Sequence, residues 1–323
     1  MSGTGGVGAG VGRGRRWRGV LLKAGVSVLL LAVLLWEADV GRLVAVFGQM
    51  EPLPIIVALI FYTSLQFMAA FRWRVLLQAK ALEIPYLRLV AHYYGGVFFN
   101  QFLPSSIGGD VYRGYGLFRD ARDTGITVAS LVLDRLSALA ALLALSLGAL
   151  AFMQVDSRLT WTVILLNLGF AAGVVALVPP ACRRLLLRLV ERLGWGRVGA
   201  VIQEVTRAIF SYWDHRRALG AALLLAFLIQ VALVGILYLT ALALHVSAPL
   251  AYFFLTVPLI ELVTLLPISL GGVGLREGSF VFFFAQVGVP SAAALAISLS
   301  WFGMSVAMAG IGALVLLWRA RRR

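Results

Sequence analysis

Residues 103–115, "LPSSIGGDVYRGY", and residues 266–278, "LPISLGGVGLREG", repeat one pattern within very apolar sequence. In each copy a proline is followed by a glycine pair and then by an arginine, at the same spacing. Proline ends a helix because it lacks a backbone N–H, and glycine permits positive φ angles and close backbone approach. The pattern therefore predicts that a helix breaks and a new one begins, twice. The repeated positions are Pro104, Gly108, Gly109 and Arg113, then Pro267, Gly271, Gly272 and Arg276.

The composition is that of an integral membrane protein. Of the 323 residues, 61% are hydrophobic and 13% charged, whereas soluble domains are roughly half apolar and about a quarter charged. Lys and Arg number 28 against 14 Asp and Glu. The basic residues cluster between apolar segments, so membrane topology accounts for them better than nucleic-acid binding does, and we expect no nucleic-acid partner.

The chain divides into apolar segments separated by basic ones. Residues 1–19 are glycine-rich and are predicted to form a disordered basic tail, and residues 319–323, "RARRR", form a basic C-terminal tail. No small-residue cleavage site follows the first apolar run, which is therefore expected to be an uncleaved helix. The predicted spans cover residues 19–36, 52–71, 125–155, 159–182, 218–244 and the last part of 278–318, where a short loop around Pro290 precedes the final helix.

The basic segments set a predicted topology, because short basic loops remain cytoplasmic. The two termini and residues 72–80, 113–123 and 183–217 are all placed inside the cell. Both flanks of the first motif then lie on the cytoplasmic face of the membrane, so the motif is predicted to form a re-entrant hairpin. The chain enters the second motif from the outer face. The prediction is an all-α polytopic protein with about six spanning helices and two inverted re-entrant hairpins. The alternative is eight plain spans with both motifs as ordinary loops.

Residues 183–217 have apolar side chains at helical spacing, with Arg and Glu on the other faces. A basic amphipathic segment that carries Trp195 and Trp213 is typical of a helix lying in the membrane interface. A small cytoplasmic helical hairpin is the alternative.

The two motifs predict an anion site near the middle of the membrane. Helix N-termini attract anions, and arginine can hold a phosphate bidentately. Arg113 and Arg276, with the glycine pairs, are therefore expected to bind the phosphate of a lipid between two inverted halves. The alternative is that the glycines serve helix packing and each arginine pairs with a local acid.

Other polar residues near the motifs are candidates for the same site. Asn100 and Gln101 are expected either to line the cavity or to cap the broken helix. Asp110, Glu277 and Glu261 are expected to balance the arginines or to select a cationic head group.

Asp134 and Arg135 are also candidates, because ionisable residues inside the membrane are costly. They are adjacent and point about 100° apart on a helix, so each is expected to pair with another segment. Asp110 or Glu261 is the predicted partner of Arg135.

No catalytic residue, metal or cofactor is predicted. Cys182 is the single cysteine, and His92, His215 and His245 match no metal-ligand spacing. The sequence also lacks a nucleophile elbow, a P-loop and a zincin motif.

Four stretches carry a resemblance to a known family: "FRWRVLL", "NQFLPSSIGGDVYRGY", "LDRLSAL" and "LPISLGGVGLREGSF". Over about residues 20–318 the chain resembles the transmembrane regions of lysylphosphatidylglycerol synthases, also called flippase-like domains. The family more often has Glu-Arg where this chain has Asp134-Arg135. The resemblance implies a flippase-like transmembrane domain without the soluble domain that attaches the amino acid.

The resemblance and the motifs together favour a translocase of a phosphate-bearing lipid in the cytoplasmic membrane, with both termini inside the cell. Stand-alone relatives are associated with cell-envelope or polyprenyl-linked glycan pathways, so proteins of envelope biosynthesis are possible partners. One alternative is a membrane-embedded enzyme that acts on a lipid phosphate with Asp110 and His92. The other is an accessory scaffold that docks envelope enzymes through residues 183–217.

Overall fold

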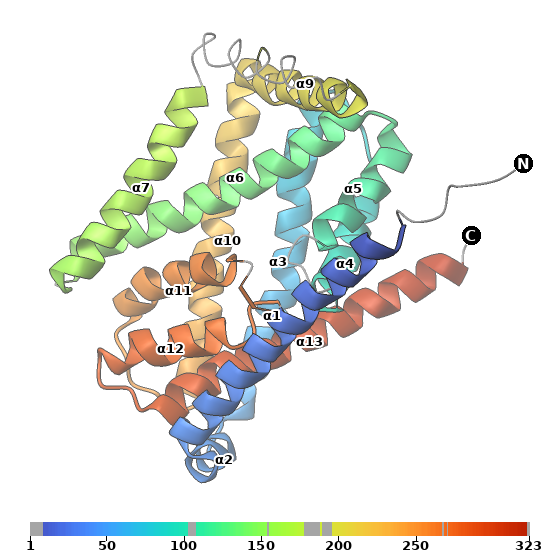
Figure 1. Ribbon diagram of the computed structural model, residues 1–323. Coiled ribbons are helices and arrows are strands. Elements are labelled where there is room, and N and C mark those ends of the chain that lie inside the picture. Colours follow the sequence, from blue (N-terminus) through green and yellow to red (C-terminus); the bar gives the residue numbers. More distant parts are fainter. Residues whose placement is uncertain are drawn as a thin grey trace, which may run out of the picture.

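The computed structural model describes residues 9–102, 108–153, 155–177, 188, 196–266, 268–269 and 271–321, and Pro104 and Pro267 lie outside this part of the chain. The described residues form helices joined by short connections and contain no strand, which confirms the all-α prediction. Figure 1 shows the helices with their labels. Their bounds are α1 (Ala9–Ala38), α2 (Val40–Gly48), α3 (Pro52–Gln78), α4 (Tyr86–Phe102), α5 (Gly108–Ala121), α6 (Thr124–Ala149), η1 (Leu150–Phe152), α7 (Ser157–Leu177), α9 (Gly196–Ser211), η2 (Tyr212–His215), α10 (Arg216–Ala243), α11 (Leu250–Thr264), α12 (Leu275–Ala285) and α13 (Ser291–Arg321).

Five helical stretches of the described chain are long and apolar enough to cross a membrane. The sixth predicted span, the first helix, extends from Ala9 to Ala38, so residues 9–19 are helical where a disordered tail was expected. Within the part of this helix whose side chains the structure describes, Ala24–Ala38 is apolar. The five stretches are Pro52–Gln78, Thr124–Phe152, Ser157–Val175, Val201–Ala243 and Ser291–Arg321.

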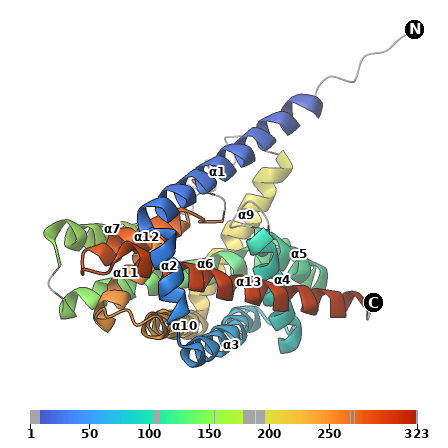
Figure 2. The same ribbon diagram turned by 90° about the horizontal axis from the view of Figure 1, so that it is seen from below.

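The two sequence motifs separate pairs of short helices. The first lies between α4, with 17 residues, and α5, with 14, and the second lies between α11, with 15, and α12, with 11. At about 1.5 Å per residue, none of these helices reaches the roughly 30 Å thickness of the hydrocarbon core. The members of each pair pack against each other. In both views the pair α4–α5 lies toward one end of the molecule and the pair α11–α12 toward the other (Figures 1 and 2).

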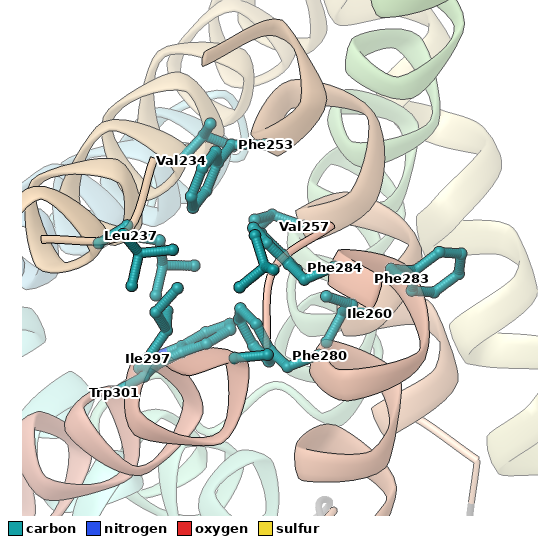
Figure 3. Packing of buried hydrophobic residues seen from close by; sticks show 14 of the residues in the cluster. Val234, Leu237, Phe253, Val257, Ile260, Phe280, Phe283, Phe284, Ile297 and Trp301 are labelled. Atoms are coloured by element: carbon teal, nitrogen blue, oxygen red, sulfur yellow. The ribbon is translucent and has the colours of Figure 1, made fainter. Parts of the chain in front are cut away.

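A large apolar core joins the second helix pair to α10 and α13 (Figure 3). The Phe284 ring contacts both Phe253 and Phe280, with centroids 4.9 Å and 5.5 Å apart respectively. Trp301 of α13 packs edge-on against Phe280. This core holds α12, the helix that follows the second motif, in place.

The glycines of the first motif allow α4 and α5 to approach closely. Gly109 and Gly96 face each other so closely that a Cβ on Gly109 would meet the carbonyl oxygen of Gly96 and the side chain of Asn100. The Asn100 Oδ1 atom accepts a hydrogen bond of 2.7 Å from the Gly109 N–H. Asn100 therefore caps α5, as one of the two predictions for it stated.

A methyl group at Gly109 should force α4 and α5 apart. We expect Gly109→Ala to lower the free energy of unfolding by roughly 1–3 kcal/mol, the usual cost of overpacking a tight contact. Gly148→Ala on α6 is the matched control, since nothing lies within 4 Å of the added Cβ. Thermal unfolding in detergent measures both, and equal stability of the two variants would contradict the close packing.

The second motif has a different local structure although its residues have the same spacing. Gly271, Gly272 and Gly274 have φ angles of 60°, 80° and 86°, so the chain forms a left-handed turn that side chains rarely adopt. Helix α12 then begins at Leu275, whereas α5 begins at the first glycine of its motif. Consequently Arg276 lies in the first turn of its helix and Arg113 lies more than a turn inside its own.

One of the basic segments differs from its prediction. Residues 72–80 were expected to form a cytoplasmic loop, but α3 continues to Gln78 and Arg72 is buried within it. Of residues 183–217, the described part packs against other helices through specific contacts. Glu204 of α9 accepts a hydrogen bond of 2.9 Å from the N–H of Gly125 at the start of α6, and Lys80 Nζ donates one of 2.9 Å to the carbonyl of Ser211.

Candidate functional site

A buried group of charged side chains connects α3, α5 and α6. The Asp134 carboxylate is 2% exposed and accepts three hydrogen bonds: from Arg72 Nε at 2.8 Å, from Arg113 Nη2 at 2.9 Å and from the Tyr93 hydroxyl at 2.7 Å. Two arginines thus share one acid, and Tyr93 of α4 completes its coordination. A buried carboxylate held by several donors stays ionised and fixes the helices that carry them.

Arg113 belongs to this buried group and not to an open surface. Its side chain is 6% exposed, and its guanidinium carbon lies 3.7 Å from the centre of the Tyr93 ring and 4.4 Å from that of Trp73. Trp73 in turn donates a hydrogen bond of 3.1 Å to Ser130 of α6. This stacking and pairing hold Arg113 within the buried group, where its buried Nε makes no hydrogen bond to any described residue.

A cavity of about 1080 Å³ lies beside the buried group and extends between the two helix pairs. Seven of the residues predicted from the sequence line it, and they come from both motifs and from α6 and α11. They are Asn100, Gln101, Asp110, Arg135, Glu261, Gly271 and Arg276. Gly108, Gly109, Arg113, Asp134, Gly272 and Glu277 do not line it, and the two prolines lie outside the described residues.

The most accessible arginine of the cavity is Arg135, whose side chain is 48% exposed. Its Nε donates a hydrogen bond of 2.7 Å to Asp110 Oδ2, one of the two partners that the sequence predicted. Asp110 also lies 3.4 Å from Arg113 Nη1 and so links the buried group to the cavity. The remaining donors of Arg135 are available to an anion that enters the cavity.

Arg276 contributes the second positive charge from the opposite helix pair. Its Nε and Nη2 donate to one oxygen of Glu277 at 3.1 Å and 2.7 Å. The other oxygen of Glu277 accepts a hydrogen bond of 2.6 Å from the Gly274 N–H, which closes the first turn of α12. Glu277 is 1% exposed, so it positions Arg276 and does not itself face the cavity.

The cavity is lined by polar and by apolar side chains. Polar side chains from α3, α4, α10 and α13 lie around the charged residues, among them Tyr62, Gln230 and Ser305. An apolar wall of the cavity is formed by side chains of α5 and α6, the same helices that carry Asp110 and Arg135. Its residues are Val111, Tyr115, Phe118, Val128, Leu131, Val132, Leu136 and Leu139. This arrangement suits a molecule with a charged head and a hydrocarbon chain.

Sequence reasoning missed the scaffold of the buried group. Arg72, Trp73 and Tyr93 were not identified as partners, because "RWR" at the end of an apolar run resembles a cytoplasmic flank. The signal that could have identified them is Asp134 itself, since an acid inside the membrane requires a cation from another segment.

The geometry gives no support to a lipid-phosphate enzyme built on His92. His92 Nε2 lies 3.2 Å from Asp120 and not against Asp110, and His92 does not line the cavity. Within the described residues, no group of three or more His, Cys, Asp or Glu side chains is placed to hold a metal ion.

The fold and the cavity define a polytopic α-helical membrane protein that holds several ionised side chains between its helices. Residues 20–322 match the family described as the lysylphosphatidylglycerol synthase TM region, and the chain belongs to this family. The resemblance predicted from the four sequence stretches is thereby confirmed. Comparisons with curated proteins and with solved structures gave no match.

Proposed function

We propose that the protein binds a phosphate-bearing lipid in this cavity and translocates it across the cytoplasmic membrane. The observation that carries the proposal is the joint position of Arg135 and Arg276 in one cavity whose wall along α5 and α6 is apolar. Arginine binds phosphate oxygens bidentately, and the apolar wall accommodates an acyl or prenyl chain. Membership in the family is consistent with a lipid substrate.

The position of the cavity between the two pairs of short helices supports translocation. In many transporters the substrate lies between two repeats with broken helices, and one repeat moves against the other. Here α4–α5 contributes Asp110 to the site and α11–α12 contributes Arg276. A relative movement of the two pairs would open the cavity to one face of the membrane and then to the other.

A bulky side chain in the apolar wall should block the lipid. We expect Val132→Trp to reduce the transfer rate of a fluorescent phosphatidylglycerol in proteoliposomes by about tenfold or more, since a loss of about 1.4 kcal/mol in binding equals a factor of ten. Val132 lines the cavity on the same face of α6 as Arg135.

The matched control is Leu168→Trp on α7, at a position that is 60% exposed and does not line the cavity. The control should transfer lipid like the wild type. Absence of transfer by the wild-type protein, relative to protein-free vesicles, would contradict the proposed function. Unchanged transfer by Val132→Trp would contradict the assignment of the lipid chain to this wall.

We also propose that both helix pairs are re-entrant and enter from opposite faces, with both termini cytoplasmic. A membrane-impermeant maleimide tests this on a Cys182→Ser background. Glu83→Cys and Arg119→Cys, at the two ends of α4–α5, should react from one face only. Ser247→Cys and Gln286→Cys, at the two ends of α11–α12, should react only from the other.

The alternative of eight plain spans gives a different labelling pattern. The two ends of each pair would then react from opposite faces, because each pair would cross the membrane once. If all four cysteines reacted from the same face, both helix pairs would be re-entrant, but they would enter from one face and would not be inverted. Proteins of envelope biosynthesis remain proposed partners.

A further inference from the structure

Glu261 differs from the other acidic residues around the cavity. Asp110, Asp134 and Glu277 each lie within ion-pairing distance of at least one arginine. Glu261 lines the cavity from an otherwise apolar helix and makes no ion pair with any residue that the structure describes. An acid in such a place is costly, and its presence requires a reason.

The charges of the site balance only when Glu261 is ionised. The buried group and the cavity together hold four arginines and four acids, so the ionised set has no net charge. Protonation of Glu261 leaves one net positive charge, which one phosphodiester anion would neutralise. The residues counted are Arg72, Arg113, Arg135 and Arg276 against Asp110, Asp134, Glu261 and Glu277.

The surroundings of Glu261 suit both of its charge states. Helices α6, α10 and α12 pack against α11. Arg135 of α6 and Gln230 of α10 line the same cavity as Glu261. Arg276 of α12 and Asp110 of α5 face the same cavity. Since an amide both donates and accepts hydrogen bonds, Gln230 can serve the carboxylate and the carboxylic acid alike.

We propose that Glu261 binds a proton together with the lipid phosphate, so that one proton moves with each lipid; this rests on the proposed function. A phosphate held by Arg135 offsets the positive charge that stabilises the Glu261 carboxylate. The carboxylate then takes a proton from water in the cavity and becomes a carboxylic acid. When the lipid leaves on the other face, Arg135 again favours the carboxylate and the proton returns to water there.

The helix that carries Glu261 is built to bend. Pro258 lies inside α11, three residues before Glu261, and cannot donate the helical hydrogen bond at its position. The positive φ angles of Gly271 and Gly272 follow shortly after the end of α11. The carboxyl therefore lies on a segment with a weak point on each side, and it can move with the α11–α12 pair.

Coupling of this kind is reciprocal. If phosphate binding promotes protonation of Glu261, then protonation strengthens phosphate binding by the same factor. Binding of phosphatidylglycerol should therefore strengthen as the pH falls through the range in which Glu261 titrates. In Glu261→Gln, which cannot ionise, this dependence on pH should be absent.

Proton uptake can be measured directly on the purified wild-type protein in weakly buffered detergent with a pH-indicator dye. Saturation with phosphatidylglycerol should take up about one proton per lipid bound, and diacylglycerol, which lacks the phosphate, should take up none. Binding of phosphatidylglycerol without proton uptake would overturn the coupling. Absence of binding would overturn the proposed function instead, so the two failures are distinguishable.

Three variants identify the group that takes up the proton. Glu261→Gln should remove the uptake, and Glu261→Asp, which keeps a titratable carboxyl, should restore it. Glu83→Gln, at an exposed position between α3 and α4, is the matched control and should behave like the wild type. Uptake of the wild-type size in Glu261→Gln would overturn the assignment, and the wild-type measurement stands whether or not that variant folds.

A pH gradient across proteoliposomes tests the same coupling during transport. One pH unit corresponds to about 1.4 kcal/mol, so it should shift the equilibrium distribution of fluorescent phosphatidylglycerol between the leaflets by up to about tenfold. In Glu261→Gln the shift should fall to the level of protein-free vesicles. Transfer by the wild type that ignores the gradient would overturn proton coupling while leaving the proposed function intact.

Discussion

Asp134→Asn is expected to destabilise the protein by about 3–5 kcal/mol, the cost of breaking a buried ion pair from one side. The asparagine keeps the shape of the side chain but removes its charge. Arg72 and Arg113, both buried, then lose the carboxylate that accepts from them at 2.8 Å and 2.9 Å. Thermal or denaturant unfolding of the purified protein in detergent measures the change.

Two further variants define the cause of that loss. Asp156→Asn removes an exposed acid at the start of α7 and should change the stability by no more than about 0.5 kcal/mol. The triple variant Arg72→Met, Arg113→Met, Asp134→Leu replaces the whole group by apolar side chains and should be more stable than Asp134→Asn alone, because no buried charge is left unpaired. If Asp134→Asn were as stable as the wild type, the buried group would not hold α3, α5 and α6 together.

Arg135→Gln is expected to weaken the binding of phosphatidylglycerol by about 10- to 150-fold. This range follows from about 1.5–3 kcal/mol for hydrogen bonds to a charged group. The fold should remain intact, since Arg135 is half exposed and Asp110 keeps Arg113 as a partner. Arg135→Lys should recover part of the affinity, because lysine retains the charge but not the bidentate geometry.

Two controls test whether Arg135→Gln removes a phosphate contact. One changes another arginine, and the other uses a lipid without phosphate. Arg158→Gln, at an exposed position on α7, should leave binding unchanged. Diacylglycerol should bind the wild type and Arg135→Gln equally, since it carries no phosphate. A loss that is the same for both lipids would indicate a general structural defect and would contradict a phosphate contact. Arg113→Gln, by contrast, should lower stability first, because its partner Asp134 is buried.

Much of the fold follows from the sequence because the membrane imposes strong local rules. A charge-free run of about 20 residues must be helical, and a proline followed by two glycines interrupts a helix. Five of the predicted spans are present, and both motifs separate helices. The sequence also predicted that Arg135 pairs with Asp110 or with Glu261, and the structure shows the pair with Asp110.

The two motifs show that local sequence rules do not predict the local backbone structure. Their residues have the same spacing, but Gly109 packs against Gly96 at the start of a helix and Gly272 adopts a positive φ in a turn before one. The difference comes from their neighbours, α4 in one case and the end of α11 in the other. Sequence periodicity carries no information about those neighbours.

The sequence by itself determined that helices fill the membrane and that two of them are broken. Only the tertiary structure decided which charges became scaffold and which face the cavity. Arg113 is buried because α3 brings Arg72 and Trp73, and α4 brings Tyr93, to the same side of α5. Arg135, one residue from Asp134, points about 100° away from it and therefore faces the open cavity. Burial depends on which helices pack together, and that packing is set by contacts between residues far apart in the chain.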